Sequence, residues 1–228
     1  MTGLISVRRD VVEVCRKLYD RGLISGTEGN VSVRIPGNRI LVTPAGMAKA
    51  DVRPDDLVEV TLDGKRVRGA RPQSTEIGVH LRLYARRADV GAVVHAHPPT
   101  ATGFAVAGES FSACVLPEVI FQVGWVPLIP YETPGTMELA DRFEPFLETH
   151  DAFLMANHGA VTCGRTLSVA HQRMESLEQA ARIMLTARLL GRVNELTSAD
   201  VTKLIAARTR AGLPETHPRC GTTRRRMD

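Results

Sequence analysis

The sequence predicts an α/β fold in which a mainly antiparallel central sheet is covered by helices. Two hairpin patterns occur early: residues 31–35 and 39–43 flank a Pro-Gly-Asn turn, and residues 57–62 and 65–68 flank Asp63-Gly64. Asp-Gly is a preferred pair in tight hairpin turns. Helical patterns are interspersed with the later strands, as expected when helices cover the faces of a sheet. Neither a glycine-rich dinucleotide motif nor a P-loop is present.

Apolar spacing and capping residues give the order of the elements. The first helix is expected from about Ser6, with Gly22 as its stop signal. The helix before the central histidines starts after Ser74 or Thr75 as its cap. The other elements expected, in chain order, are a strand over 90–97, a short helix over 99–107, a strand over 126–131, a helix over 136–147, strands over 153–157 and 160–163, a long helix over 168–190 and a short helix from about 198.

Length and composition are typical of one globular domain, which we expect over residues 1–218. The chain has 228 residues, of which 43% are hydrophobic and 24% are charged. Residues 219–228 are arginine-rich, contribute +3 of the formal net charge of +4, and are expected to form a disordered tail. The remainder is nearly neutral, so nucleic acid is not an expected partner. No long apolar run or signal pattern occurs, so a cytoplasmic protein without a membrane span is expected.

Two histidines separated by one residue, His95 and His97, end the apolar run that begins at residue 90. Side chains on a strand alternate between faces, so both imidazoles are expected to point the same way, as two ligands of one metal ion would. His158 follows another apolar run and can complete a set of three with an open fourth position, which is typical of a catalytic metal site. The alternative is that each is an ordinary hydrogen-bonded histidine. The other four histidines are expected to be structural or solvated: His80, His150, His171 and His217.

Glu76 is a candidate general base, because it lies in the first turn of the expected helix after residue 75. A metal bound to a substrate carbonyl acidifies the adjacent C–H, and a nearby carboxylate can take that proton and return it. The alternative is a solvated carboxylate beside the helix dipole. Ser74 and Thr75 either only cap the helix or also bind a phosphate or carboxylate there. Histidine ligands favour zinc or another late transition metal over magnesium.

Six short segments form an ordered set of motifs. They are Glu28-Gly29-Asn30-Val31-Ser32, Thr43-Pro44-Ala45-Gly46, Ser74-Thr75-Glu76, His95-Ala96-His97, Pro130-Tyr131-x-x-Pro134-Gly135-Thr136 and Asn157-His158-Gly159. In this order the chain resembles the class II aldolase and adducin-head family, of the fuculose-phosphate aldolase type, from about residue 11 to residue 207. The resemblance implies an α/β/α fold and a homotetramer with active sites at subunit interfaces.

The resemblance also implies roles for individual residues. The implied metal ligands are His95, His97 and His158, with Zn²⁺ as the ion and Mn²⁺ or Co²⁺ as alternatives. Glu76 is implied to handle the proton and to occupy the open metal position in the resting enzyme. The implied phosphate-binding residues are Gly29, Asn30, Ala45, Gly46, Ser74 and Thr75. The implied reaction is reversible cleavage of a ketose 1-phosphate, such as L-fuculose 1-phosphate, to dihydroxyacetone phosphate and an aldehyde.

Three departures from the fuculose-phosphate aldolase pattern bear on the substrate. Ala45 replaces a hydroxyl residue, which removes a hydrogen bond to the phosphate worth roughly 1.5–3 kcal/mol. Residues 114–118 contain no tyrosine where that aldolase has one that assists protonation, and Glu118 is either a substitute for it or a structural residue. The region after Gly191 has no tyrosine to meet the aldehyde in a neighbouring subunit.

The leading hypothesis is a zinc-dependent aldolase that acts on a phosphorylated ketose. The alternative is a metal-dependent decarboxylase or dehydratase of the same family, acting on a carboxylated or other sugar-derived substrate, since Ala45 leaves room for a carboxylate. Glutamate at position 76 counts against the family's pentulose-phosphate 4-epimerases, which carry aspartate there. A non-enzymatic adducin-like module need not retain the ligands, whereas this chain has all three histidines and Glu76.

Overall fold

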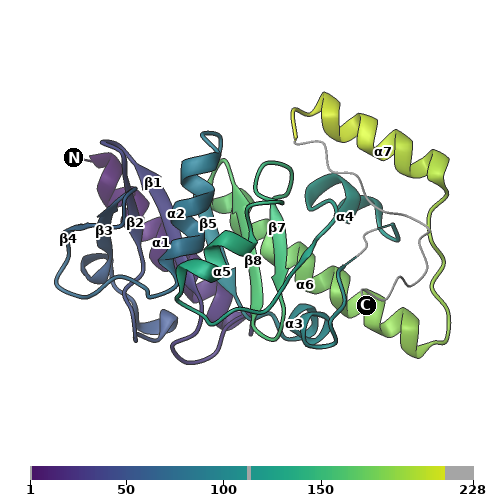
Figure 1. Ribbon diagram of the computed structural model, residues 1–228, viewed down its shortest axis with the longest axis horizontal. Helices are drawn as coiled ribbons and strands as arrows, with labels where there is room; N and C mark the ends of the chain where they lie inside the picture. The colour runs from purple at the N-terminus through teal and green to yellow at the C-terminus, as the bar shows by residue number, and fades with distance from the viewer. Residues whose placement is uncertain (1, 112–113, 214–228) are drawn as a thin grey trace.

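A computed structural model describes residues 2–111 and 114–213, and its strands form one sheet in the order β4-β3-β2-β1-β5-β8-β7-β6 (Figure 1). All pairings are antiparallel except that between β6 and β7. The prediction of a mainly antiparallel sheet is therefore confirmed. The predicted tail at 219–228 lies outside the described residues. The strands are β1 (Asn30–Ile35), β2 (Arg39–Val42), β3 (Val58–Thr61), β4 (Arg66–Arg68), β5 (Ala92–Ala96), β6 (Leu128–Ile129), β7 (Ala152–Met155) and β8 (Gly159–Gly164).

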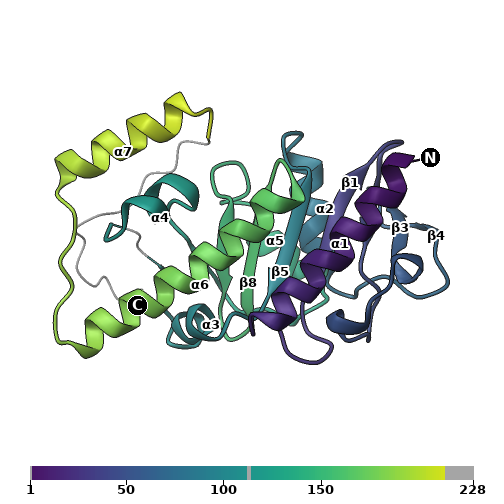
Figure 2. The ribbon, with the colours of Figure 1, turned by 180° about the vertical axis from the view of Figure 1, so that it is seen from behind.

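Helices cover both faces of the sheet. They are α1 (Thr2–Asp20), α2 (Ile77–Arg86), α3 (Pro99–Val106), α4 (Pro117–Gln122), α5 (Met137–Arg142), α6 (Leu167–Leu189) and α7 (Ser198–Arg210), with short 3-10 helices at Lys49–Asp51 and Pro54–Asp56. The α2 and α5 helices lie on one face (Figure 1), and α1, α3 and α6 lie on the other (Figure 2). Successive residues of β5 serve the two cores: Val93 packs in the α2 and α5 core, and Val94 packs in the α1 and α6 core. No described helix is long and apolar enough to cross a membrane.

Two expected elements are no more than half as long in the structure, and proline explains both. The strand expected over 126–131 is only Leu128–Ile129, because Pro127 and Pro130 on either side lack the N–H that a ladder requires. The helix expected over 136–147 ends at Arg142, because Pro145 lacks an N–H donor and disfavours the helical conformation of the residue before it. The chain continues in turns as far as 149, so its apolar residues still reach the core.

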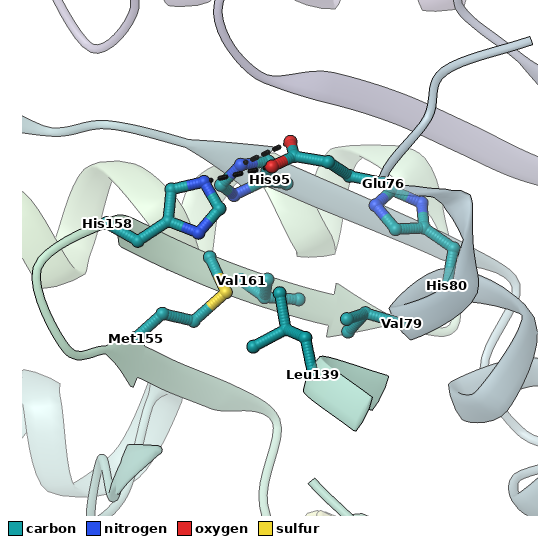
Figure 3. Close-up of a pocket in the computed structure, with 8 residues that line it drawn as sticks. All are labelled: Glu76, Val79, His80, His95, Leu139, Met155, His158 and Val161. Carbon is teal, nitrogen blue, oxygen red and sulfur yellow. Dashed lines mark ion pairs between the residues drawn. The ribbon is translucent and has the colours of Figure 1, made fainter. Parts of the chain in front are cut away.

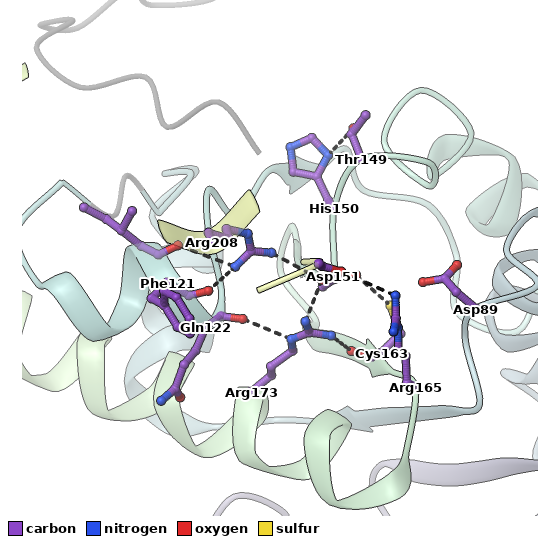
Figure 4. A network of polar contacts seen from close by, with 12 residues as sticks. Asp89, Phe121, Gln122, Thr149, His150, Asp151, Cys163, Arg165, Arg173 and Arg208 are labelled. Atoms are coloured by element: carbon purple, nitrogen blue, oxygen red, sulfur yellow. Dashed lines mark hydrogen bonds and ion pairs between the residues drawn. The ribbon is translucent and has the colours of Figure 1, made fainter. Parts of the chain in front are cut away.

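A buried carboxylate, Asp151, joins distant elements just before β7 begins (Figure 4). It pairs with Arg87 after α2 at 2.8 Å, Arg173 of α6 at 2.7 Å and Arg208 of α7 at 3.4 Å. Arg208 is fully buried and also donates to the carbonyl of Phe121 in α4. These contacts fasten the last described helix to the sheet and to α4, and we call Asp151 with its three arginines the arginine cluster.

Candidate functional site

The histidine pair lies where β5 ends. His95 is in the strand and faces the α2 side of the sheet, while the backbone N–H of His97 donates to the carbonyl of Leu23 at 3.0 Å. The Nε2 atoms of the two histidines are 3.2 Å apart. Gly29 allows the loop before β1 to pass close by, because a Cβ there would lie 2.6 Å from the carbonyl oxygen of His95. The two imidazoles therefore converge, as the strand alternation predicts.

His158 comes from the tight turn between β7 and β8. Asn157 before it adopts a left-handed conformation with φ of 55°, which asparagine tolerates better than most residues. Gly159 after it has to lack a side chain, because a Cβ there would lie 2.7 Å from Cδ2 of His97. The ring centroids of His95, His97 and His158 are each 5.0 Å from the other two. Two turns, one at the end of β5 and one between β7 and β8, thus bring the three predicted ligands together.

Glu76 precedes α2, and its carboxylate lies against the histidines (Figure 3). One oxygen is 3.0 Å from Nε2 of His158, and the other is 3.1 Å from Nε2 of His95. The side-chain amide of Asn30 donates to the second oxygen at 3.3 Å. The Glu76 side chain is 20% exposed, so solvent reaches it from one side.

Burial and hydrogen bonding act in opposite directions on Glu76. Burial raises the pKa of its carboxyl group, but hydrogen bonds from His158 and His95 lower it more, and the net pKa lies well below the usual range. For His97, burial and the neighbouring His95 and His158 lower the pKa to about 3. His97 is therefore neutral at ordinary pH and has a ring nitrogen lone pair available for a metal ion.

The donor set fits a divalent metal ion. Nδ1 of His95 is 2.9 Å from the carbonyl of Ala160, so His95 could bind a metal ion through Nε2 while Nδ1 donates to that carbonyl. Nδ1 of His97 is 3.6 Å from a carboxylate oxygen of Glu28. A tetrahedral zinc site with Zn–N bonds of about 2.0–2.1 Å has ligand atoms roughly 3.3 Å apart. The Nε2 atoms of His95 and His97 are 3.2 Å apart, close to that value, and the ligand atoms of all three histidines lie within 4.8 Å of one another. We name His95, His97, His158 and Glu76 the histidine cluster.

The six residues predicted to bind phosphate lie on three loops that meet beside Glu76. Asn30 connects the first loop to Glu76 directly. An isolated β-bridge between Pro44 and Gln73 joins the loop of Ala45 and Gly46 to the loop of Ser74 and Thr75. The structure therefore joins these loops to one another, and Asn30 and Ser74 bring two of them into contact with Glu76.

Several donors of these loops are engaged within the protein. The backbone N–H of Ala45 donates to the carbonyl of Pro72 at 3.0 Å, and that of Ser74 donates to the carbonyl of Thr43 at 3.3 Å. The hydroxyl of Ser74 accepts from the backbone N–H of Glu76 at 3.3 Å. The α2 helix begins after Glu76, and no side chain caps it, so the prediction that Ser74 or Thr75 caps this helix is wrong, and the Ser74 hydroxyl instead fixes the loop that leads to Glu76.

A buried lysine, which sequence patterns do not mark, braces two of the loops. Lys49 is 3% exposed, and its Nζ donates to the carbonyls of Thr27 at 2.8 Å and Met47 at 2.9 Å. Burial lowers its pKa, while Cys15 and Glu76 nearby raise it. A lone lysine after a loop is usually solvated, so only the folded structure reveals this positive charge beside the predicted anion site.

The remaining candidates fall elsewhere. Glu118 is exposed on α4, and α4 packs against α6 and α7. His80, His150 and His171 are buried, as structural histidines are, and His217 lies outside the described residues.

Known proteins resemble this chain in sequence and in structure. Residues 9–185 match the model of the class II aldolase and adducin N-terminal domain. The 3-oxo-tetronate 4-phosphate decarboxylase of Escherichia coli strain K12 is 33% identical over 205 residues, covering 87% of this chain and 95% of that protein. The L-fuculose phosphate aldolase of Methanococcus maripaludis is 33% identical over 174 residues, covering 76% and 93%. The crystal structure of Escherichia coli YgbL superimposes with a TM-score of 0.83 at 31% identity, covering 88% and 98%.

Aldolases and decarboxylases both break carbon–carbon bonds, so the prediction of a class II lyase is confirmed at that level. The α/β architecture agrees with that of the superimposed relative. The matched region includes the three histidines and Glu76. The chain therefore belongs to the class II aldolase and adducin family.

Proposed function

We propose that this protein is a metal-dependent carbon–carbon lyase that acts on a phosphorylated, sugar-derived substrate. The observation that carries the proposal is the convergence of three histidines, two of which, His95 and His158, also contact the carboxylate of Glu76. A metal ion held by His95, His97 and His158 would polarise a substrate carbonyl and stabilise charge on the carbon beside it. Glu76 is the group in this cluster that can deliver a proton to that carbon or remove one.

Two reactions named for the relatives lead to the same three-carbon product. Cleavage of a ketose 1-phosphate releases an aldehyde and leaves the enediolate of dihydroxyacetone phosphate. Loss of CO₂ from a 3-oxo-tetronate 4-phosphate breaks the C1–C2 bond, and the electron pair of that bond forms the same enediolate. In either reaction, a proton from Glu76 to carbon completes the product. The histidine cluster alone therefore suits both reactions.

The two reactions differ in their need for a second acid–base group. Cleavage to an aldehyde requires a base for the hydroxyl on the departing carbon, whereas decarboxylation requires none. Residues 114–118 contain no tyrosine, and Glu118 is exposed on α4. These observations favour decarboxylation of a 3-oxo sugar-acid phosphate as the first candidate and ketose 1-phosphate cleavage as the second.

Both reactions share the proton transfer between the enediolate and dihydroxyacetone phosphate, and this step can be tested without knowing the aldehyde. Zinc-loaded protein is incubated with dihydroxyacetone phosphate in D₂O, and C–H to C–D exchange is followed by NMR. We expect exchange that chelator treatment abolishes and that Glu76→Gln slows by about 10²–10⁴-fold while bound zinc is retained. Full exchange in the Glu76→Gln variant would remove Glu76 from the mechanism.

The two candidates are then separated by their products. The protein is given 3-oxo-tetronate 4-phosphate and L-fuculose 1-phosphate in parallel, and CO₂ and aldehyde are quantified. CO₂ release from the first substrate, with little aldehyde from the second, would support the decarboxylase. The opposite pattern would support the aldolase, and inactivity on both together with absent exchange would reject the proposal.

We further propose zinc as the native ion, with Mn²⁺ or Co²⁺ as alternatives, and a homotetramer with active sites at subunit interfaces. Apolar side chains exposed on the last turns of α6 support association: Leu185, Leu189 and Leu190 are 45%, 80% and 79% exposed. Mass spectrometry of protein purified without added metal tests the first point, and light scattering tests the second. A cytoplasmic location stays a prediction from the sequence.

A further inference from the structure

A short chain of buried polar groups lies behind the histidine cluster, on the α2 side of the sheet. Ser32 of β1 contacts two side chains one helical turn apart on α2: its Oγ is 2.7 Å from Nδ1 of His80 and 2.8 Å from the hydroxyl of Tyr84. The exposed fractions of the three residues are 0% for Ser32, 1% for His80 and 2% for Tyr84. Their neighbours on α2, Val79 and Leu83, are apolar and buried, so these polar groups have to satisfy one another.

The donors and acceptors that these groups offer determine which atom donates each hydrogen bond between Tyr84, Ser32 and His80. Burial raises the pKa of Tyr84, so the phenol keeps its proton, and Ser32 Oγ is the acceptor nearby. If Ser32 accepts from Tyr84, its own proton goes to Nδ1 of His80, and the imidazole then carries its proton on Nε2. The reverse direction would leave the phenol proton without that acceptor and Nε2 as a bare lone pair. The first arrangement satisfies more groups, so His80 presents an N–H donor from Nε2.

That donor has no hydrogen-bond partner among the described residues. It borders a small cavity that Glu76 and His158 also line, and Figure 3 shows the imidazole of His80 beside the Glu76 side chain. Nδ1 of His158 is also buried without a described partner. The free space for a water centre is about 10 Å³, close to what one water molecule needs. The rest of the wall is apolar: Val79, Leu139, Met155 and Val161.

Glu76 needs such a donor whenever it leaves the histidines. In the structure its carboxylate is held by His95, His158 and the amide of Asn30. A substrate that takes the place of the carboxylate leaves Asn30 as the remaining partner of these three. A carboxylate with one fixed bond can rotate, and proton transfer to carbon requires it to stay within hydrogen-bond reach of that carbon.

We propose that His80 is a positioning residue: its Nε2–H, oriented by Tyr84 and Ser32, binds the Glu76 carboxylate directly or through one water when substrate displaces that carboxylate from the histidine cluster. The proposal rests on the proposed function of Glu76 as the proton-handling group. His80 lies one helical turn after Glu76, so its place relative to Glu76 is set by α2 itself. His80 touches neither substrate nor metal in this role and acts only through Glu76.

Paired variants test the role in turnover. His80→Leu removes the donor, and we expect kcat to fall about 10–100-fold, the usual effect of losing such a supporting hydrogen bond, with KM and bound zinc nearly unchanged. His80→Gln places an amide N–H near the position of Nε2, and it is expected to recover most of the loss. Equal defects in the two variants, or a defect confined to KM or zinc content, would overturn the positioning role.

A spectroscopic measurement tests the hydrogen bonds between Tyr84, Ser32 and His80 independently of activity. With ¹⁵N-labelled histidine, the ring nitrogen shifts of His80 report which nitrogen carries the proton. We expect the Nε2–H form in the native protein, and a shift toward the Nδ1–H form in Ser32→Ala. Tyr84→Phe is expected to weaken the preference less, because Ser32 can still donate to Nδ1. An Nδ1–H form in the native protein would overturn the inference even if the lyase activity is found.

The two measurements also separate failure of this inference from failure of the proposed function. Absence of both lyase reactions and of deuterium exchange, with His80 in the Nε2–H form, would reject the proposed function and with it the role of His80 toward Glu76. Activity that is lost in Glu76→Gln but kept in His80→Leu would leave the proposed function standing and reject the positioning role alone.

Discussion

Two carboxylates in this molecule each face three nitrogen-bearing side chains, yet their clusters differ in kind. Asp151 is fully buried and pairs with Arg87, Arg173 and Arg208, whose guanidinium groups stay charged at all ordinary pH values. Glu76 is 20% exposed and meets the imidazoles of His95 and His158, whose ring nitrogens can act as donors or as acceptors. The two clusters lie on the same sheet, one before the start of β7 and the other where β5 ends.

The difference teaches what separates a structural ionic cluster from a binding site. In the arginine cluster the bonding capacity of the carboxylate is used to join α2, α6 and α7 to the sheet (Figure 4). In the histidine cluster the Nε2 atoms of His95 and His97 are 3.2 Å apart, a separation that calls for a proton or a cation between them. The first arrangement is complete within the protein, and the second could be completed by a metal ion held between the histidines.

The largest expected effect is a loss of stability when the arginine cluster is broken. Asp151→Asn removes the negative charge that three buried guanidinium groups share, although Arg87 keeps its pair with Asp89, and we expect the free energy of unfolding to fall by about 3–5 kcal/mol. Glu76→Gln in the histidine cluster is expected to cost only about 0.5–1.5 kcal/mol in the metal-free protein, as for an ordinary hydrogen bond. Urea unfolding of both metal-free variants measures this, and equal losses would contradict the distinction between the clusters.

The next effect concerns metal rather than stability. His97→Ala removes one predicted ligand, and we expect zinc affinity to fall at least about 100-fold, since even losing a hydrogen-bond partner of a ligand typically costs 10–100-fold. Arg208→Met is the matched change in the arginine cluster, and it is expected to loosen α7 without loss of zinc. Chelator competition measures both affinities. Stoichiometric, tightly bound zinc in His97→Ala would show that the ligand set is wrong.

The smallest effect, for one histidine and a change of one pH unit, is a pH dependence of stability in the metal-free protein. Burial lowers the pKa of His80 and of His97 to about 3, whereas both titrate near 6.5 in an unfolded chain. The unfolded state therefore binds more protons between these values, and stability falls as the pH falls, by roughly 1.4 kcal/mol per pH unit for each histidine. The arginines stay charged throughout this range and add no slope.

Urea unfolding between pH 7 and pH 4, in steps of about one unit, measures this slope. His80→Gln is expected to remove the contribution of one histidine and leave that of His97. An unchanged slope in this variant would show that His80 is not held neutral in the folded protein.

Local signals account for the parts of the fold and site that could be predicted from the sequence. Strand alternation and turn residues act over a few positions, so the hairpins around Asp63-Gly64 and the convergence of His95 and His97 follow from neighbouring residues alone. The effect of Pro145 on the helix after Thr136 is also local. The apolar spacing of that segment nevertheless continues beyond the point where the backbone can remain helical, so spacing alone predicts too long a helix.

Contacts between distant residues account for the parts that could not be predicted. Asp151 is 57 positions from Arg208 and 64 positions from Arg87, so no sequence window contains the arginine cluster. Lys49 becomes recognisable only when the carbonyls of Thr27 and Met47 meet it. His80 has the helical spacing of a core residue. Only its contact with Ser32, 48 positions away, reveals a polar function for it.

The brace formed by Lys49 has a consequence for binding entropy. Because Nζ holds the carbonyls of Thr27 and Met47 together, the two loops are ordered when the chain folds rather than when a ligand arrives. Ordering a flexible segment at the moment of association weakens binding, and a preorganised segment avoids that cost. An anion that enters between these loops therefore meets a wall already in its final shape, with a buried positive charge behind it.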